Sequence, residues 1–295
     1  MTRPLITADD VRRDRRLQVP PGAVVTPLAR DLLRQRGARL EPAARRAPPA
    51  RWVVANWKSH KTAAEARGFA AAFRAGLAGG ARARAAICPP FTLLASLGEA
   101  LAGAADLGAQ DVSPHGEGAH TGEVAARHLV DAGCSLVIVG HSERRHAGED
   151  DALCRRKLRV ALEAGLAPIL CVGETLEERR ASRTQTVVAR QLEAALSGLE
   201  PARGRRVIVA YEPRWAIGTG ETPTEAAVAE VLAHVRAVLR RVLRPDAADA
   251  VPVLYGGSVD ERNAATLLHL PGCAGGLIGG ASLDATRLLR ILEVA

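Results

Sequence analysis

Long hydrophobic runs are missing from this chain of 295 residues, although 47% of it is apolar. Its apolar stretches fall short of the roughly 18 residues that a membrane-spanning helix needs, so we expect no membrane partner. Aromatic residues make up only 3% of the chain, so alanine, valine, leucine and isoleucine must fill its core. The N-terminal residues lack the apolar segment of a secretory signal, which favours a cytoplasmic protein.

Cysteine is scarce and carries no recognisable pattern. The chain holds five, and no two form a CxxC pair, which excludes the common zinc and redox motifs. Cys88, Cys134 and Cys171 lie in or beside apolar runs. Such positions are typical of reduced cysteines in the core of a cytosolic protein.

Lysine is nearly absent, and the positive charge is unevenly distributed. The net charge is +8, but residues 1–50 hold eleven arginines against five acidic residues, a net of +6. The remaining 245 residues therefore carry only +2. This small excess does not support a nucleic-acid-binding face on the main body, so no nucleic-acid partner is expected.

The first fifty residues differ from the rest in composition and pattern. Thr26 is a good helix N-cap with Pro27 at the first helical position, and an earlier short helix is expected to begin at Thr7. The prolines within residues 42–49 indicate a linker. We therefore predict an N-terminal extension with its linker over residues 1–50 and a main domain over residues 51–295.

From residue 51 onward, short apolar runs alternate with longer amphipathic stretches. The runs predict strands at 52–56, 85–88, 107–109, 136–139, 168–172, 207–211, 253–255 and 276–278. The stretches between them predict helices near 62–78, 91–102, 123–132, 150–164, 175–197, 223–243, 260–269 and 283–294. This α/β pattern suits a closed (β/α)8 barrel. A doubly wound sheet is the alternative, but it normally shows a glycine-rich fingerprint after its first strand, and none stands there.

A carboxylate stands at the end of the sixth predicted strand, where a barrel carries its active site. This is Glu212, which heads the loop 213–222 with its glycines Gly218 and Gly220. A carboxylate on a rigid strand end, followed by a flexible loop, is typical of a base beneath a lid. An isolated Glu-Pro pair is more often part of a solvated surface loop, so the interpretation depends on the other strand ends.

Two further strand ends carry groups suited to the same chemistry. Lys58 follows the first strand, where a compact positive charge can meet an anionic substrate. His141 follows the fourth strand, and Ser142 can cap the helical turn behind it, an arrangement that favours neutral imidazole. Each residue alone is often an ordinary surface or structural residue.

Glycine-rich turns follow the last two predicted strands, at 256–258 and 279–282. The backbone N–H groups of such turns hold phosphate in many barrels. Either turn alone would mark only a change of chain direction. Both together, in this order, indicate a phosphate-binding site.

Five motifs together resemble those of the triosephosphate isomerase family, in order and over about residues 51–295. They are Asn56-Trp-Lys58, Gly140-His-Ser-Glu-Arg-Arg145, Tyr211-Glu-Pro-Arg-Trp-Ala-Ile-Gly-Thr-Gly220, Tyr255-Gly-Gly-Ser-Val259 and Gly279-Gly-Ala-Ser-Leu283. The resemblance implies a TIM barrel and an aldose–ketose isomerase of glycolysis and gluconeogenesis. Its substrates would be D-glyceraldehyde 3-phosphate and dihydroxyacetone phosphate. The resemblance implies neither a metal nor an organic cofactor.

The resemblance also assigns roles to the matching residues. Glu212 would be the general base and neutral His141 would polarise the carbonyl, an arrangement already known for this family. Loop 213–222 would close as a lid, because an exposed enediol phosphate tends to lose its phosphate. The substrate and its phosphate would be held by Asn56, Lys58, Gly218, Ser258, Gly279 and Gly280, with Ser142 and Glu143 in supporting positions.

The long loop Asp111–Glu123 resembles the family segment that reaches into a partner subunit, which implies a homodimer. A metal site at Asp111, His115 and His120 in this loop is a less favoured alternative. Departures from the family pattern occur at His60, Asp111, His120 and Arg214. They leave room for a tetrulose-phosphate isomerase with the same mechanism. A non-catalytic sugar-phosphate-binding or scaffold barrel is the second alternative, although it would not need a base.

Residues 1–50 lie outside the family pattern. Segments 6–10 and 20–30 are similar to N-terminal segments of enzymes from bacterial microcompartment and ethanolamine-utilisation systems. The similarity suggests the hypothesis that residues 1–45 dock the enzyme to a shell or another protein. A neutral extension is the alternative.

Overall fold

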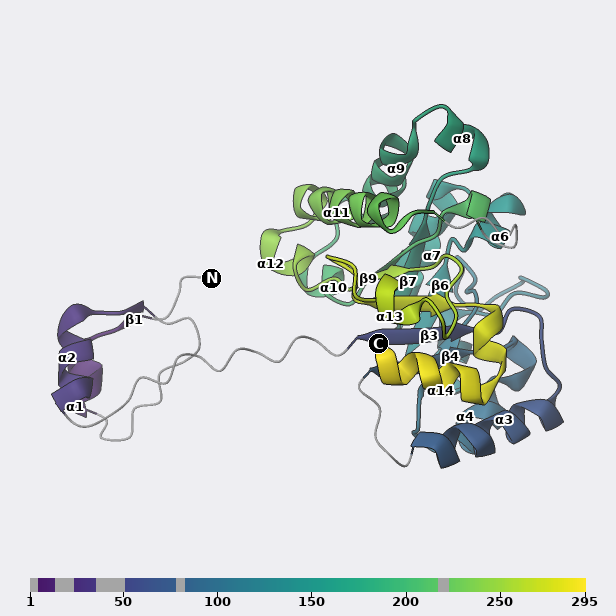
Figure 1. The fold of residues 1–295 in the computed structure, drawn as a ribbon, viewed down its shortest axis with the longest axis horizontal. Coiled ribbons are helices and arrows are strands. Elements are labelled where there is room, and N and C mark those ends of the chain that lie inside the picture. The colour runs from purple at the N-terminus through teal and green to yellow at the C-terminus, as the bar shows by residue number, and fades with distance from the viewer. Residues whose placement is uncertain (1–4, 14–23, 36–50, 78–82, 217–222) are drawn as a thin grey trace. The chain divides into compact units, whose positions relative to one another are not determined.

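A closed barrel of eight parallel strands dominates the computed structural model of this chain (Figure 1). The structure describes residues 5–13, 24–35, 51–77, 83–216 and 223–295. The chain divides into two compact units, residues 1–50 and 51–295, and the barrel forms the second. No helix in the described ranges has the length and apolar character needed to cross a membrane.

The barrel strands follow one another in chain order around the barrel, and the last pairs with the first. The sequence predicts every strand with its ends within one residue, and the expected (β/α)8 TIM barrel is confirmed. The strands are β3 (Trp52–Asn56), β4 (Arg84–Cys88), β5 (Asp106–Ala109), β6 (Leu136–Val139), β7 (Ala167–Val172), β8 (Ile208–Tyr211), β9 (Val253–Tyr255) and β10 (Gly275–Ile278).

Helices cover the outside of the barrel (Figure 1). They are α3 (Ala63–Gly76), α4 (Leu94–Leu101), α5 (Ala126–Asp131), α6 (Ser142–His146), α7 (Asp151–Glu163), α8 (Leu176–Arg180), α9 (Thr184–Leu196), α10 (Pro201–Gly204), α11 (Glu225–Val242), α12 (Pro245–Ala248), α13 (Ala264–Leu267) and α14 (Ala285–Val294). The single helix predicted over 175–197 is wrong, because Ser182 takes a left-handed conformation with a φ of 54° and separates α8 from α9. The short helices α10 and α12 were not predicted, whereas α6 lies where the sequence predicts a helical turn after His141.

Alternate residues of each strand point to opposite sides of the barrel wall. On β3, Val53 and Ala55 pack outward in the large core beneath the helices, whereas Val54 joins a smaller cluster inside the barrel. Every barrel strand except β5 contributes one or two buried side chains to that interior cluster. Because side chains fill the interior, a ligand must bind at the strand ends.

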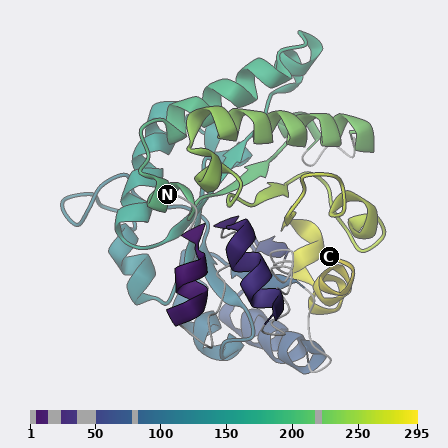
Figure 2. The same cartoon turned by 90° about the vertical axis from the view of Figure 1, so that its left-hand side faces the viewer.

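The N-terminal unit has a small core of its own. Its helices α1 (Ala8–Arg13) and α2 (Pro27–Gln35) lie side by side (Figure 2), and its strands β1 (Leu5–Ile6) and β2 (Val24–Val25) pair in parallel. The Ala29 N–H donates a hydrogen bond to Oγ1 of Thr26 at 3.4 Å, so the predicted N-cap is confirmed. The predicted linker over 42–49 lies outside the described residues. The core residues are Ile6, Val11, Ala29 and Leu33.

The pairing of the last strand with the first can be tested at Gly275, which pairs with Trp52 where β10 meets β3. Gly275 has a φ of 134°, and an added Cβ would lie 1.8 Å from the Trp52 carbonyl oxygen. We expect Gly275→Ala to lower the free energy of unfolding, measured in urea, by about 3 kcal/mol. The control is Gly272→Ala, where φ is 81° but a Cβ would meet no atom within 4 Å. Gly272→Ala should lower the free energy of unfolding by only about 1 kcal/mol. Equal losses in the two variants would contradict a close approach of the backbones of β10 and β3 at Gly275.

Candidate active site

A cavity of about 470 Å³ lies at the carboxyl ends of the barrel strands. It brings together side chains and turns that are far apart in the sequence. Gly218, which the sequence also assigns to the site, lies outside the described residues, and Ser142 and Glu143 follow His141 on α6. The predicted site residues that line the cavity are Asn56, Lys58, His141, Glu212, Ser258, Gly279 and Gly280.

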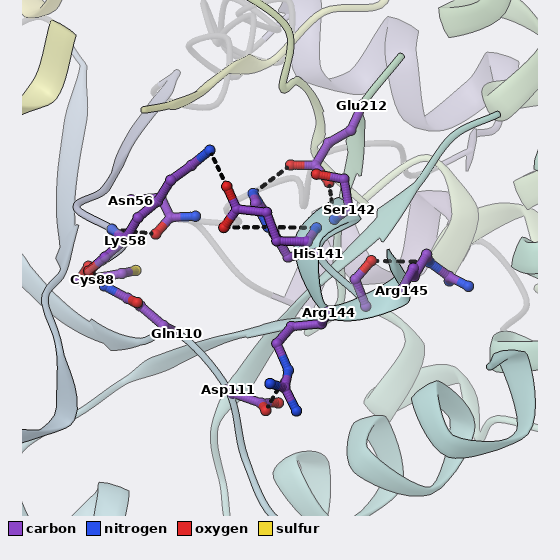
Figure 3. A network of polar contacts seen from close by, with 12 residues as sticks. Asn56, Lys58, Cys88, Gln110, Asp111, His141, Ser142, Arg144, Arg145 and Glu212 are labelled. Atoms are coloured by element: carbon purple, nitrogen blue, oxygen red, sulfur yellow. Dashed lines mark hydrogen bonds and ion pairs between the residues drawn. The ribbon is translucent and has the colours of Figure 1, made fainter. Parts of the chain in front are cut away.

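Glu212 and His141 contact each other in the lining of this cavity (Figure 3). Nε2 of His141 lies 3.2 Å from Oε1 of Glu212, and the two side chains are only 7% and 3% exposed. The Ser142 backbone N–H donates to the other carboxylate oxygen at 3.0 Å. The Glu212 N–H donates to the Val172 carbonyl at 2.8 Å and so continues the pairing of β8 with β7. Hydrogen bonds therefore fix the position of both the backbone and the carboxylate of Glu212 in this structure.

The position of His141 selects one form of its imidazole. The sequence predicts Ser142 as the cap of α6, which is wrong: the N-cap is His141, and its Nδ1 accepts a hydrogen bond from the Glu143 backbone N–H at 3.3 Å. A ring nitrogen that accepts a hydrogen bond carries no proton, so the single proton of neutral imidazole lies on Nε2. That N–H points at Glu212 and into the cavity, where it can donate to a substrate oxygen.

Lys58 places a positive charge on the same side of the cavity as His141. Its backbone φ is 52°, a conformation that surrounding contacts must hold in a residue other than glycine, and its N–H donates to Oδ1 of Asn56 at 3.1 Å. Its Nζ donates to Oε1 of Glu143 at 2.7 Å. Burial alone would raise the pKa of Glu143, but the hydrogen bond and charge of Lys58, with smaller contributions from His141 and His60, lower the pKa below its usual value.

The two glycine turns form another part of the cavity lining. The Gly256 N–H donates to the Tyr211 carbonyl at 2.8 Å, and a Cβ on Gly256 would lie 2.7 Å from Cγ of Glu212. Gly279 leads into the 3-10 turn Gly280–Leu283, and a Cβ on Gly280 would meet no atom within 4 Å. A group as large as phosphate can approach such a backbone closely, because no side chain stands in its way.

The sequence analysis missed a carboxylate behind the site. Glu174 follows β7 and is fully buried, and it accepts a hydrogen bond from Nε1 of Trp215 at 2.9 Å. The rule that polar residues at strand ends carry function would have found it, had it been applied to β7. Arg287 also lines the cavity, paired with Glu261 at 2.9 Å, and no motif in the sequence indicated it.

The loop Asp111–Glu123 contains the two histidines considered for a metal. His115 and His120 stack with their ring centroids 4.2 Å apart. Within the described part of the chain, no group of acidic, histidine and cysteine side chains is arranged to hold a metal ion.

Comparison with known proteins identifies the family to which this barrel belongs. Residues 51–295 match the family model described as triosephosphate isomerase. The chain belongs to the triosephosphate isomerase family. The triosephosphate isomerase of Symbiobacterium thermophilum is 48% identical over 245 residues, which are 82% of this chain and 96% of that protein. The enzyme of Moorella thermoacetica is 47% identical over 243 residues, 82% of this chain and 97% of that protein.

A solved structure leads to the same family. The crystal structure of triosephosphate isomerase from Bartonella henselae matches with a TM-score of 0.74 and 40% identity, over 83% of this chain and 98% of that one. The expected family, barrel fold and isomerase activity are therefore confirmed. The relatives favour neither the four-carbon isomerase nor the non-catalytic barrel, and the family match leaves residues 1–50 outside.

The Lys58–Glu143 pair can be tested by titration. We expect Lys58→Met to raise the pKa of Glu143, because the effect of burial then acts without its compensating charge. Carbon-13 NMR of labelled glutamate side chains would follow that titration. Lys61→Met is the control, because Nζ of Lys61 lies over the Trp57 ring at 5.2 Å, and it should leave Glu143 unchanged. A Glu143 pKa unaltered by Lys58→Met would contradict this account.

Proposed function

We propose that this chain interconverts D-glyceraldehyde 3-phosphate and dihydroxyacetone phosphate, with Glu212 as general base and neutral His141 as electrophile. The observation that carries the proposal is the 3.2 Å separation between Nε2 of His141 and the Glu212 carboxylate. The cavity that holds this pair is also lined by Lys58 and by glycine turns suited to phosphate. A binding or scaffold barrel has no need of such an acid–base pair.

The proton transfers follow from these positions. The Glu212 carboxylate removes a proton from the carbon next to the carbonyl, while Nε2–H of His141 donates a hydrogen bond to the carbonyl oxygen as its charge develops. Glu212 returns the proton to the former carbonyl carbon, and the proton of the neighbouring hydroxyl passes to the former carbonyl oxygen, next to Nε2 of His141, so that the new carbonyl forms and the isomerisation is complete without net oxidation. Both carboxylate oxygens have hydrogen-bonding partners in this structure, so Glu212 must exchange these contacts for the substrate carbon during turnover.

The remaining residues would bind and stabilise charge. Lys58 would balance the negative charge of the substrate and the enediolate, and Glu143 would hold its ammonium in place. Asn56 would hydrogen-bond to the substrate in the same pocket. Loop 213–222 would close over the site as a lid, although residues 217–222 lie outside the described structure. The phosphate would contact Gly218, Ser258, Gly279 and Gly280.

Shortening the base by one methylene tests its role. We expect Glu212→Asp to lower kcat roughly 100-fold or more, because the carboxylate withdraws from the reacting carbon by about 1 Å. A coupled assay would measure turnover, and calorimetry would measure binding of glycerol 3-phosphate, which should change by no more than about twofold. Glu163→Asp is the control, because Glu163 is exposed on α7 and pairs with Arg203 away from the cavity. Full turnover in Glu212→Asp would remove Glu212 from its proposed role.

We also propose a cytoplasmic homodimer formed through the loop Asp111–Glu123. Residues 115–123 are all exposed, yet the loop has ordered internal contacts such as the hydrogen bond from the Ser113 N–H to the Val124 carbonyl at 2.9 Å. An exposed loop with defined structure suits contact with a second copy. All five cysteines are free and buried, as expected for a reducing compartment.

The separate core of the N-terminal unit supports a docking role for residues 1–45. Deletion of residues 1–45 should leave kcat and the dimeric state, measured by analytical ultracentrifugation, unchanged, because the barrel has its own core and site. In fractionated cells of the source organism, the deletion should abolish co-sedimentation with shell or partner assemblies. Unchanged partitioning would count against docking, and a monomeric full-length protein would count against the dimer.

A further inference from the structure

Arg287 is a cation in the lining of the active-site cavity, and most of its hydrogen-bond donors are free. It lines the cavity together with the glycine turns at 256–258 and 279–280. Its Nε donates to Oε2 of Glu261 at 2.9 Å. Among the described residues, no hydrogen bond occupies its terminal nitrogens Nη1 and Nη2. A guanidinium has five N–H donors, so those on both terminal nitrogens are available to a ligand.

The ion pair of Arg287 with Glu261 connects the two chain segments that leave the glycine turns. Glu261 follows Ser258 of the first turn by three residues, and Arg287 follows Gly280 of the second by seven. The guanidinium is therefore held by both of the segments that continue from the proposed phosphate site. Because Glu261 takes the Nε side, Nη1 and Nη2 remain as a planar fork of the kind that matches the oxygens of a phosphate.

The two other cations in the lining, Lys58 and Arg262, are less suited to this contact. Nε and Nη2 of Arg262 both donate to its neighbour Asp260, and the Arg262 side chain is 85% exposed. Lys58 is paired with Glu143 and has an ammonium in place of a planar fork. Arg287 is thus the guanidinium in the lining that keeps both terminal nitrogens free among the described residues.

The position of Arg287 within α14 is not explained by the stability of the helix. Arg287 lies in the first turn, and its backbone N–H donates to the Asp284 N-cap carboxylate at 2.9 Å. The positive end of the helix dipole disfavours a cation in this turn. A phosphate dianion beside Arg287 would be attracted by the guanidinium and by the helix N-terminus together.

We propose that Arg287 is a substrate-binding residue that donates hydrogen bonds from Nη1 and Nη2 to the substrate phosphate. Glu261 orients the guanidinium from its Nε side. The phosphate is then held by backbone N–H groups of the glycine turns and by one charged side chain. The inference rests on the proposed function, and it concerns recognition of the phosphate rather than the proton transfers at Glu212 and His141.

The test compares two substitutions of Arg287 with one of a second arginine on α14. Arg287→Gln should weaken binding of glycerol 3-phosphate, measured by calorimetry, about fivefold, because a charged contact to the phosphate is lost. KM for glyceraldehyde 3-phosphate should rise similarly, with kcat changed less than about twofold. Arg287→Lys keeps the charge without the fork and should fall between Arg287→Gln and the wild type. Arg290→Gln removes the same charge at an exposed position outside the cavity lining and should match the wild type.

A substrate without phosphate separates phosphate recognition from a general effect on the site. D-glyceraldehyde has the same reacting carbons, and its slow isomerisation to dihydroxyacetone can be followed by NMR. Its kcat/KM should differ by less than about twofold between Arg287→Gln and the wild type, while that for glyceraldehyde 3-phosphate falls about fivefold. Equal losses with both substrates would overturn the proposal. A lower Tm with unchanged binding of glycerol 3-phosphate would show a purely structural ion pair and would also overturn it.

Failure of the proposed function would give a different pattern from failure of this inference. A wild-type protein that turns over no triose phosphate would refute the proposed reaction, and calorimetry with glycerol 3-phosphate would still test Arg287. Normal turnover by the wild type, with unchanged binding of glycerol 3-phosphate in Arg287→Gln, would refute the role of Arg287 alone.

Discussion

The arrangement of the site depends on the Glu212 carboxylate, which is kept almost entirely out of water and has no lysine or arginine paired with it among the described residues. Glu212 accepts hydrogen bonds from the Ser142 N–H at 3.0 Å and faces the imidazole N–H of His141 at 3.2 Å. These neutral donors compensate the buried charge and leave the carboxylate able to take a proton. Both donors come from the start of α6, so the location of this short helix determines the environment of Glu212.

A helix of five residues that buries only Ser142 has little packing of its own to fix it. Arg145 compensates for this by bonding the Gly140 carbonyl at 2.9 Å, Asp151 at 2.7 Å and the Cys171 carbonyl at 3.3 Å. The side chain of Arg145 is 6% exposed. One buried arginine thus ties α6 to β6, to β7 and to the start of α7, which makes the first turn of α6 a rigid support for catalysis.

Three carboxylates near the cavity have three different partners. Glu143 is half exposed and paired with Lys58, Glu174 is buried and paired with Arg179, and Glu212 is buried among neutral donors. Of the three, Glu212 lines the cavity and can reach a bound substrate, whereas Glu143 and Glu174 hold a cation in place beside it.

Much of this could be predicted from the sequence, because buried parallel strands appear as short apolar runs and their ends mark the site. The strands were found within one residue, and the motif residues on β3, β6, β8, β9 and β10 meet in one cavity. The helix α6 was predicted only as a helical turn after His141, because it has almost no apolar face from which its length could be inferred. The contact between Glu174 and Trp215 joins residues 41 positions apart, and nothing in the local pattern of either residue indicates the other.

The measurement that tests the central claim most directly is a coupled assay on the full-length protein, with glyceraldehyde 3-phosphate and a four-carbon ketose phosphate offered in parallel. The account predicts a kcat/KM for the triose that approaches the diffusional range of about 10⁸ M⁻¹s⁻¹, with the four-carbon substrate far behind. A higher kcat/KM for the four-carbon substrate, or no turnover of either, would contradict it.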